Sequence, residues 1–353
     1  MHTFYVSKTP ADSSVYPTIS AALDAIPMDF NEPACIYLAP GIYHEKITIN
    51  KPYVTLTGTG SSNKDVVLTY DDYALAPMAD IGKLGTFRSY SVFIDAHDVT
   101  LQNLTIENAS GDSLSHGQAI ALYADGDRLV IDSCRLIGHQ DTLFTGPLPP
   151  KEIEPDGFIG PKQFAPRING RQYYKNCYIC GDIDFIFGSA TAYFENCVIE
   201  SLRRTTDAND IQGYVTAAST PEDQEYGYVF SNCKLISKDC PPNSVYLGRP
   251  WRNYAKTVFL ECALGNHIHE CGFHDWKKED ARNTVLYAEY RNYPASSADT
   301  TSNNRSRNDD IHCIGGRCIP YPHRAEYVCE LDAVQAEHFF KENVLSGADH
   351  WNP

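Results

Sequence analysis

Long hydrophobic runs are missing from this sequence of 353 residues. No stretch approaches the roughly 20 consecutive apolar residues that cross a bilayer, so we expect no membrane contact. Positive charge is also scarce, because 29 lysines and arginines face 45 aspartates and glutamates, which gives a net charge of −16. Nucleic acid is therefore disfavoured as a partner, since its phosphates are bound by clustered lysine and arginine.

A secretory leader is not visible either, because no basic segment followed by an apolar stretch opens the sequence. Without one, the 12 cysteines are interpreted as reduced thiols rather than as a disulfide framework. We therefore expect a cytoplasmic protein, or a secreted one if a leader has been removed. Zinc half-sites at Cys177-x-x-Cys180 and at Cys313 with Cys318 are an alternative, but no second pair has zinc-finger spacing. We expect no metal, no cofactor and a monomer.

Several catalytic signatures are absent as well. There is no G-x-S-x-G motif, which argues against an α/β-hydrolase serine esterase, and there is no H-E-x-x-H or Walker A motif. The segment Gly58-Thr59-Gly60 lacks the further glycine and the helix of a dinucleotide fingerprint.

Two short helices are predicted, one near each end of the chain. Residues 17–27 carry apolar residues at helical spacing and stop at Pro27, whereas residues 332–345 have a mixed face followed by Gly347 as a terminator. The region between them shows short strands, turns and glycines. The pattern is typical of an all-β protein.

A small block recurs through the middle of the chain. It consists of a polar residue, usually asparagine, then a cysteine and then alternating apolar residues, which places the cysteine and the following isoleucine or leucine on one face of a strand. The polar residue suits a bend before the strand. The block occurs at 132–137, 176–179, 196–199, 232–236 and, more weakly, 261–264, and 103–106 is an earlier member without cysteine.

Strand-turn units at irregular spacings of tens of residues indicate a solenoid, in which each coil buries its apolar face on its neighbours. A parallel β-helix fits best, with the cysteines stacked in an internal ladder. We expect one domain spanning 1–353, with long loops at about 145–170 and 293–316. The first loop is rich in proline, and the second is rich in serine, asparagine and aspartate.

A few polar residues interrupt apolar strands. Asp184 lies in I-D-F-I-F-G, Asp141 in H-Q-D-T-L-F, Arg249 in L-G-R-P-W and Gln118 in G-Q-A-I-A-L. Two carboxylates with an arginine suit general acid–base or nucleophilic carboxylate chemistry if the solenoid brings them to one groove. Each residue also fits a structural role, the aspartates as turn caps and the arginine as an ion-pair partner.

These blocks resemble the pectin methylesterase (pectinesterase) family, and they follow one another in the family's order. The resemblance extends over nearly the whole chain, from Pro17 to Pro353. The most specific blocks are G-Q-A-x-A-L at 117–122, Q-D-T-L at 140–143, D-F-I-F-G at 184–188 and L-G-R-P-W at 247–251. The resemblance implies a single-stranded right-handed parallel β-helix. It also implies an esterase that removes methyl groups from C6 of galacturonate residues in pectin or in short methylated oligogalacturonides.

The resemblance also implies a role for each matching residue. Asp184 would be the nucleophile, and Asp141 the acid that protonates methanol and then the base that activates water. Gln118 and Gln140 would donate amide hydrogens to the tetrahedral oxyanion. Arg249 would hold Asp184 ionised and oriented.

Three further residues resemble family positions that contact the sugar. They are Thr86, Phe187 and Trp251. Simple packing is the alternative for both aromatic residues, and it weighs more for Phe187. The family often has T-A-Q-G-R where this chain reads T-A-A-S-T at 216–220, which puts some substrate contacts in doubt. The loop at 145–170 is longer than the family's connection, and we expect it to lie near the groove and to favour short oligomers.

Other functions stay open on the residues alone. A polygalacturonase would need acidic residues spaced for glycoside hydrolysis, and a pectate lyase would need a calcium site with a basic residue; the motifs fit neither. The same charged residues could hydrolyse a different ester, such as an acyl thioester. A carbohydrate-binding solenoid without catalysis is the last alternative.

Overall fold

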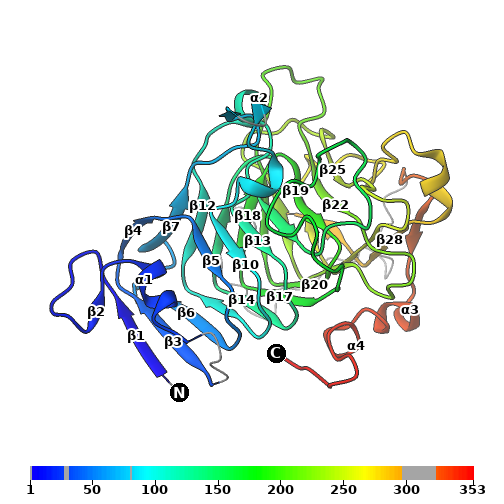
Figure 1. Cartoon of the computed structure of the whole chain (residues 1–353). Coiled ribbons are helices and arrows are strands. Elements are labelled where there is room, and N and C mark those ends of the chain that lie inside the picture. The colour runs from blue at the N-terminus through cyan, green and yellow to red at the C-terminus, as the bar shows by residue number, and fades with distance from the viewer. Residues whose placement is uncertain (1, 28–31, 80–81, 296–322) are drawn as a thin grey trace.

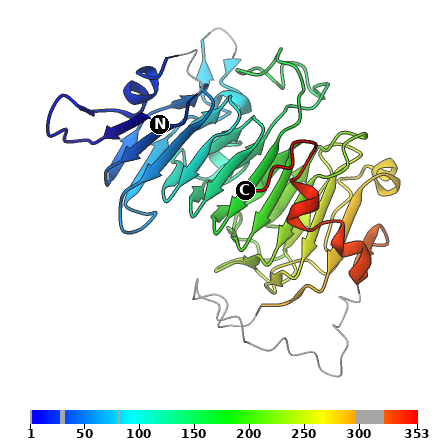
Figure 2. The same ribbon diagram turned by 90° about the horizontal axis from the view of Figure 1, so that it is seen from below.

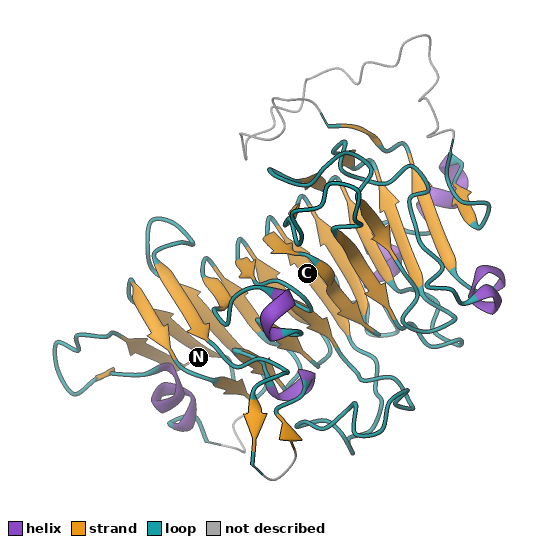
Figure 3. Cartoon of the chain, turned by 90° about the horizontal axis from the view of Figure 1, so that it is seen from above, coloured by secondary structure: helices purple, strands orange, loops and turns teal. Residues whose placement is uncertain are grey.

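The chain winds into a parallel β-helix in the computed structural model, which describes residues 2–27, 32–79, 82–295 and 323–353. Three parallel sheets run along the solenoid, and successive strands of the chain pass from one sheet to the next (Figure 1). Seen from above, the strands form a row of stacked coils with loops and short helices along its sides (Figure 3). The fold predicted from the recurring block is confirmed.

Sheet A is the longest of the three, and its strands pair in register from coil to coil. Its order is β2 (Val15–Tyr16), β1 (His2–Val6), β3 (Ala34–Leu38), β6 (Val54–Gly58), β11 (Thr100–Gln102), β14 (Leu129–Asp132), β17 (Arg171–Lys175), β20 (Thr191–Glu195), β23 (Tyr228–Ser231), β26 (Lys256–Leu260), β28 (Leu286–Tyr290) and β30 (Val328–Glu330).

Sheet B follows sheet A after a two-residue corner in most coils, such as residues 176–177 between β17 and β18. Its order is β4 (Gly41–His44), β7 (Val66–Tyr70), β12 (Thr105–Asn108), β15 (Arg135–Ile137), β18 (Tyr178–Gly181), β21 (Val198–Ser201), β24 (Lys234–Ile236), β27 (Ala263–Leu264) and β29 (Tyr293–Pro294).

Sheet C completes the coils as far as β25, and its strands lie beneath the cleft. Its order is β5 (Ile47–Ile49), β10 (Val92–Ile94), β13 (Leu122–Ala124), β16 (Leu143–Thr145), β19 (Ile183–Gly188), β22 (Gly213–Ala218) and β25 (Val245–Gly248). A short antiparallel hairpin, β8 (Pro77–Met78) with β9 (Gly82–Lys83), stands apart from the three sheets.

The corner between sheets A and B explains the recurring block. Its first residue adopts a left-handed backbone conformation, with φ of 54° at Asn176, 53° at Asn196 and 53° at Asn232. Asparagine tolerates this conformation better than bulky or β-branched residues do. The next residue, a cysteine in most coils, then points into the solenoid.

The cysteines form the predicted internal ladder. Each is buried, and each thiol lies within hydrogen-bond distance of a carbonyl of the preceding coil: Cys177 Sγ is 3.2 Å from the Ile131 oxygen and Cys197 Sγ is 3.4 Å from the Tyr174 oxygen. The ladder members are Cys134, Cys177, Cys197, Cys233 and Cys262. Cys313 and Cys318 lie outside the described residues. The described cysteines are free thiols.

Aromatic rings continue the core alongside this ladder. Tyr174, Phe194, Phe230 and Phe259 stack in consecutive coils, with ring centroids 4.4–4.6 Å apart. Because strands of neighbouring coils pair in register, like side chains meet across the ladder and the core repeats coil by coil.

The helix predicted near the amino terminus is confirmed as α1 (Ile19–Asp24), which Thr18 caps by accepting a hydrogen bond from the Ala21 amide. The single helix predicted at 332–345 is wrong, because the segment holds two short helices, α3 (Ala333–Glu337) and α4 (Lys341–Val344). Phe340 is extended between them, with φ −73° and ψ 151°, and interrupts the helix. The remaining helical turns of the described residues are α2 (Ser113–His116) and the 3₁₀ turns η1 (Thr86–Arg88) and η2 (Glu279–Asn283).

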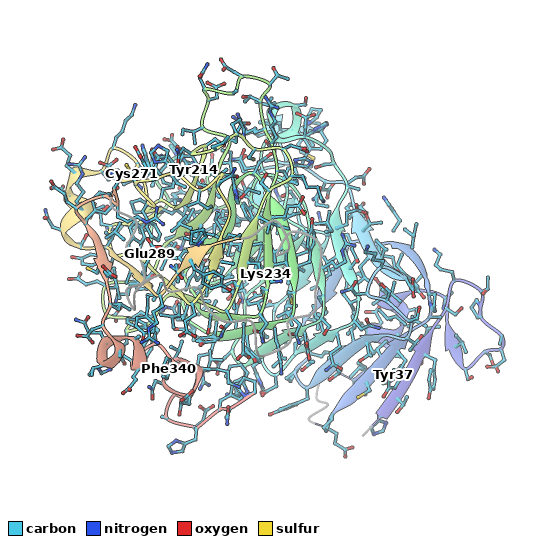
Figure 4. All side chains as sticks on the ribbon, turned by 180° about the vertical axis from the view of Figure 1, so that it is seen from behind. Tyr37, Tyr214, Lys234, Cys271, Glu289 and Phe340 are labelled. Atoms are coloured by element: carbon cyan, nitrogen blue, oxygen red, sulfur yellow. The ribbon has the colours of Figure 1, made fainter. Side chains whose placement is uncertain are left out.

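Residues 333–353, here called the C-terminal strap, cross the outer face of sheet A (Figure 2). Val344 and Leu345 pack on outward residues such as Tyr173 and Tyr193. The strap begins beyond the last coil and returns to the middle of the solenoid, where Asp349 pairs with Arg171 at 2.5 Å. In Figure 4 Phe340 of the strap lies at the end of the molecule opposite to Tyr37 of β3.

The loop predicted at 145–170 leaves β16 and rejoins at β17, as expected of an excursion from the coil. The loop predicted at 293–316 lies mostly outside the described residues, and its first two residues form β29. In the described part of the chain, no helix has the length and apolar character needed to cross a membrane.

Candidate active site

A cleft of about 920 Å³ lies on the outer side of sheet C. All eight site residues predicted from the sequence line it, although Thr86 and Trp251 are 165 positions apart in the chain. They are Thr86, Gln118, Gln140, Asp141, Asp184, Phe187, Arg249 and Trp251. The prediction that the solenoid brings these residues to one groove is therefore consistent with the structure.

The solenoid gathers these residues because they lie beside neighbouring strands of sheet C. Gln118 precedes β13, Gln140 and Asp141 precede β16, Asp184 lies in β19 and Arg249 follows β25. Those strands, with β22 between the last two, are consecutive in the sheet. Each coil thus delivers its functional side chain to the same edge of the cleft.

A bulge turns Asp184 toward the cleft. The pairing of β19 with β22 shifts between Ile183 and Ile186, and Asp184 has a φ of 51°. Phe185 and Ile186 both face the core, so the usual alternation of the strand is broken at this point. The side chain of Asp184 is left at the floor of the cleft, almost fully buried.

Asp141 is presented in the same way one coil earlier. Its φ is 67°, and its backbone amide donates to the Ile183 oxygen at 3.1 Å. Non-glycine residues with positive φ are uncommon and cluster at functional sites. Both aspartates therefore occupy conformations that the surrounding coils hold in place.

Arg249 binds Asp184 through two hydrogen bonds. Its Nε donates to Asp184 Oδ1 at 2.8 Å and its Nη2 donates to Oδ2 at 2.7 Å. This parallel geometry fixes the carboxylate more firmly than a single contact, and it favours the ionised form. The arginine side chain is itself largely buried, so the pair is poorly screened by water.

Two aromatic rings hold the guanidinium in place. Arg249 Cζ lies 3.9 Å from the ring centre of Tyr214 and 3.7 Å from that of Trp276. The sequence reading missed both rings, because an outward tyrosine in β22 and a tryptophan in a loop carry no local pattern. Lys278 was missed as well; it lines the cleft and donates to the Pro250 and Trp251 oxygens.

The two aspartates differ in their electrostatic surroundings. Burial raises the pKa of Asp141 well above its ordinary value, and the charge of Asp184 raises it further. Burial also raises the pKa of Asp184, but Arg249 opposes that rise through its charge and its hydrogen bonds. Asp141 is therefore the carboxyl that keeps its proton, and Asp184 is the one that ionises first.

Gln118 and Gln140 lie beside the aspartates with their side-chain amides unengaged by any other described residue. Their backbone oxygens are used instead, since Gln118 accepts from Ala74 and Gln140 accepts from Ala119. Each is partly exposed to the cleft. Both amides are thus available to a bound group.

Aromatic side chains form one wall of the cleft. Phe187 packs against Phe144 and Trp251, with ring centres 4.9 and 5.7 Å away, and it is buried. Phe87 adds a ring stacked on Trp251 at 6.5 Å. Phe187 therefore both packs and borders the cleft, so packing accounts for most of its surface, whereas Trp251 is more open.

The loop at 145–170 reaches this wall. Its residues 153–159 line the cleft, and Phe158 contacts Phe87 and Trp251. Arg167 holds the loop together by donating to the oxygens of Pro149, Lys162, Gln163 and Ala165. Ala217 lines the cleft, whereas Ala218, which stands at the position of the family's glutamine, is buried in the core.

Comparisons with known proteins agree with this geometry. The family model described as Pectinesterase matches residues 6–147 and 167–314. Probable pectinesterase A of Neosartorya fischeri is 35% identical over 83% of this chain and 80% of its own length, and pectinesterase 31 of Arabidopsis thaliana is 31% identical over 79% of each. A crystal structure of a pectin methylesterase in complex with a hexasaccharide shares 27% identity and a TM-score of 0.74, and the match covers 100% of this chain and 99% of that one.

The chain belongs to the pectinesterase family.

Family membership makes it a carboxylic ester hydrolase, a pectinesterase. The match leaves out residues 148–166, which lie within the proline-rich loop. The interpretation of this loop as longer than the family's connection is consistent with that gap. Among the described residues, no group of three or more histidine, cysteine, aspartate or glutamate side chains is placed to hold a metal ion.

The expected cytoplasmic location is wrong for this pectinesterase. The relatives are plant and fungal pectinesterases, and they point to an extracellular location. The interpretation of the cysteines as reduced thiols agrees with the described cysteines, which are free. Six of the ten described thiols are buried, and burial raises the pKa of thiols such as Cys177 and Cys197 well above the ordinary value and keeps them protonated.

Proposed function

We propose that this pectinesterase removes the C6 methyl ester of galacturonate residues through a covalent intermediate on Asp184. The observation that carries the proposal is the contrast between the two aspartates. Asp184 is held by two hydrogen bonds from Arg249, whereas Asp141 faces it without a cation bound to its own carboxyl. One carboxyl is prepared to attack and the other to supply a proton.

The first half of the reaction uses both groups. A carboxylate oxygen of Asp184 attacks the ester carbonyl, and the tetrahedral oxyanion accepts hydrogen bonds from the amides of Gln118 and Gln140. The bond to the methoxy oxygen then breaks, Asp141 gives its proton to that oxygen, and methanol leaves. An anhydride joins the sugar carboxyl to Asp184, and Asp141 is ionised.

The second half restores the enzyme. Asp141 takes a proton from water, whose oxygen attacks the sugar carbonyl of the anhydride. The bond to Asp184 breaks, which releases the sugar carboxyl as the acid, whose proton passes to solvent, and returns Asp184 as a carboxylate. Asp141 ends the cycle protonated, so no metal or redox partner enters the balance.

The substrate proposed for this cleft is a pectin-type galacturonan chain. The related pectin methylesterase was crystallised with a hexasaccharide, and the present cleft offers Trp251 and Thr86 beside the reacting groups. Glu154 and Asp156 of the loop also line the cleft. Basic side chains, among them Lys83, Arg88 and Arg252, line it too, so the cleft carries charges of both signs.

A methanol-release assay on methylated pectin and on methylated oligogalacturonides tests the proposal. Asp184→Ala is expected to lower kcat by about 10³-fold or more, because the nucleophile is gone. Asp98→Ala serves as the matched control, since Asp98 also binds an arginine through two contacts but lies outside the cleft. If Asp184→Ala keeps most of its activity, the mechanism is wrong.

The products separate the remaining alternatives. Methanol without chain shortening and without an unsaturated sugar agrees with a pectinesterase, whereas a polygalacturonase or a lyase would cut the chain. Turnover of an acyl thioester in place of the methyl ester would point to the other ester chemistry considered above.

We also propose that the loop at 145–170 favours short oligomers. It borders the cleft through residues 153–159 and so limits the space for a long chain at that side. Equal turnover of polymeric pectin and of methylated trimers or tetramers would contradict this preference.

A further inference from the structure

A buried carboxylate that does not line the cleft stands two positions before Asp184 and is hydrogen-bonded to the segment that carries Asp141. Asp182 occupies the corner between β18 and β19 and is only 1% exposed. Its Oδ2 accepts a hydrogen bond from Ser113 Oγ at 2.7 Å and lies 3.3 Å from His139 Nδ1. Its Oδ1 accepts from the Ile183 amide at 2.6 Å.

These partners come from three segments that each carry a proposed functional group. Ser113 opens α2, and the chain continues from α2 to Gln118. His139 immediately precedes the pair Gln140 and Asp141 in the sequence. Asp182 itself stands two positions before the nucleophile. The Asp182 side chain thus connects the segments that carry Gln118, Asp141 and Asp184.

Backbone hydrogen bonds tighten the same junction. The Asp182 amide donates to the His139 oxygen at 3.1 Å, and the Tyr214 amide donates to the Asp182 oxygen at 3.1 Å. Gly181 and Gly213 allow this close approach. A Cβ at 181 would lie 2.4 Å from the His139 oxygen, and a Cβ at 213 would lie 2.2 Å from the Asp182 oxygen. The corner therefore cannot shift without moving its neighbours.

A buried carboxylate is costly unless hydrogen bonds or a paired charge offset the loss of hydration. We propose that Asp182 is a positioning residue, which holds the segments of Gln118, Asp141 and Asp184 in register through these contacts. Its negative charge also acts on both aspartates. The inference rests on the mechanism proposed above. Asp182 acts through these residues and does not touch the substrate.

The electrostatic part of the inference has a defined sign. Burial is the main cause of the raised pKa of Asp141 and of Asp184, and the charge of Asp182 raises both further. Removing that charge lowers both pKa values. Activity needs Asp184 ionised and Asp141 protonated, so both limbs of the pH profile then move to lower pH.

Other groups around Asp182 come from separate elements and would stay in place. His139 faces it from the turn before β16, and Arg204 donates to Ser113 Oγ at 3.3 Å from the segment after β21. Cys240, in the segment after β24, has a raised pKa to which the charge of Asp182 contributes. Arg249 and Lys278 act on Asp184 from the cleft side.

Asp182→Asn is the deciding variant, because asparagine keeps the shape and can still bond to Ser113 and to the Ile183 amide. We expect its kcat/KM profile to move to lower pH by about 0.5–1 unit on both limbs. Asp98→Asn is the matched control, since it removes a hydrogen-bonded aspartate beside a histidine outside the cleft, and its profile should not move.

Ser113→Ala tests the positioning part separately. It removes the link to the Gln118 segment without changing any charge, so we expect kcat to fall about tenfold while KM and the pH profile stay the same. This variant also decides the question if Asp182→Asn does not fold, because an unchanged kcat would then overturn the inference.

The outcomes separate this inference from the proposed mechanism. A wild-type pH profile in folded Asp182→Asn, together with an inactive Asp184→Ala, overturns the role of Asp182 alone. An active Asp184→Ala overturns the mechanism, whatever Asp182→Asn does. A displaced profile in Asp182→Asn with an inactive Asp184→Ala supports both.

Discussion

Arg249 has two effects on Asp184 that a lysine could not reproduce. Its planar guanidinium matches both carboxylate oxygens, and the same plane lies between the rings of Tyr214 and Trp276. The hydrogen bonds keep Asp184 ionised, and the ring contacts hold the guanidinium in its orientation. Removing the planar group should affect both.

Arg249→Lys is therefore expected to lower kcat by about 10- to 100-fold. The pKa of Asp184, already raised by burial, rises further as the opposing cation weakens, so the acid limb of the pH profile moves to higher pH. The measurement is kcat across the pH range for methanol release. Arg128→Lys, which disturbs a similar two-contact pair with Asp98, is the control. An acid limb that does not move would contradict the role given to Arg249.

At the scale of single residues, the sequence predicted what local blocks could carry. Asp141, Asp184 and Arg249 interrupt apolar strands in recognisable motifs, and the structure places them together. Asp182 and its partners could not be found this way, because Ser113 and His139 lie 69 and 43 positions away from it. Such contacts depend on how the coils stack.

The cysteine ladder belongs to the scale of the element. The ladder could be predicted from the sequence because the coils that carry these cysteines repeat the same corner, strand and inward position. The break between α3 and α4 could not be predicted from the sequence, because it depends on the packing of Phe339 and Leu345 against sheet A. Local propensity predicts helix there, and tertiary contacts interrupt it.

Thiol labelling of the native enzyme tests the ladder. Cys329 is exposed and should react quickly with a thiol reagent, whereas the buried thiols Cys177, Cys197 and Cys233 should stay unlabelled until the protein unfolds. Burial raises their pKa, so the reactive thiolate is rare as well as inaccessible. Peptide mapping by mass spectrometry identifies each labelled position. Rapid labelling of Cys197 in the native state would contradict the ladder.

The loop at 145–170 is the element that distinguishes this cleft. Shortening it by removing 150–166 should raise kcat/KM on polymeric pectin relative to a methylated trimer by about threefold or more, because the bordering residues 153–159 are gone. Arg167→Ala, which frees the loop from its internal hydrogen bonds, should change the ratio in the same direction. An unchanged ratio in both variants would show that the loop does not select chain length.

On the scale of the whole molecule, the C-terminal strap connects coils that are otherwise not neighbours. A solenoid is stabilised mainly between adjacent coils. Here Asp349 binds Arg171 and Arg128, which belong to coils in the middle of the chain. The single domain over 1–353 and the monomeric state stay predictions.

The strap should loosen when its carboxylate is removed. The bonds from Arg171 are the main reason that the pKa of Asp349 lies well below its ordinary value. A depressed pKa means that the pair contributes fully above the ordinary carboxyl range of about 4 and is lost as the pH falls below it. Asp349→Asn should therefore speed hydrogen exchange in 341–353 at neutral pH. Asp71→Asn, at an exposed histidine contact elsewhere, is the control, and unchanged exchange in the strap would argue against this anchoring.

The placement of one functional group beside each of several successive coils has a consequence for how this enzyme can change over evolution. The spacing between Asp184 and Arg249 is set by the number of coils between them, with β22 intervening. Gaining or losing one whole coil in that interval would translate the arginine by about 4.8 Å along the axis and abolish the ion pair. Lengthening is therefore tolerated in the connecting loops, as at 148–166, and at the ends of the solenoid, whereas the stretch between Gln118 and Arg249 must keep its coil count.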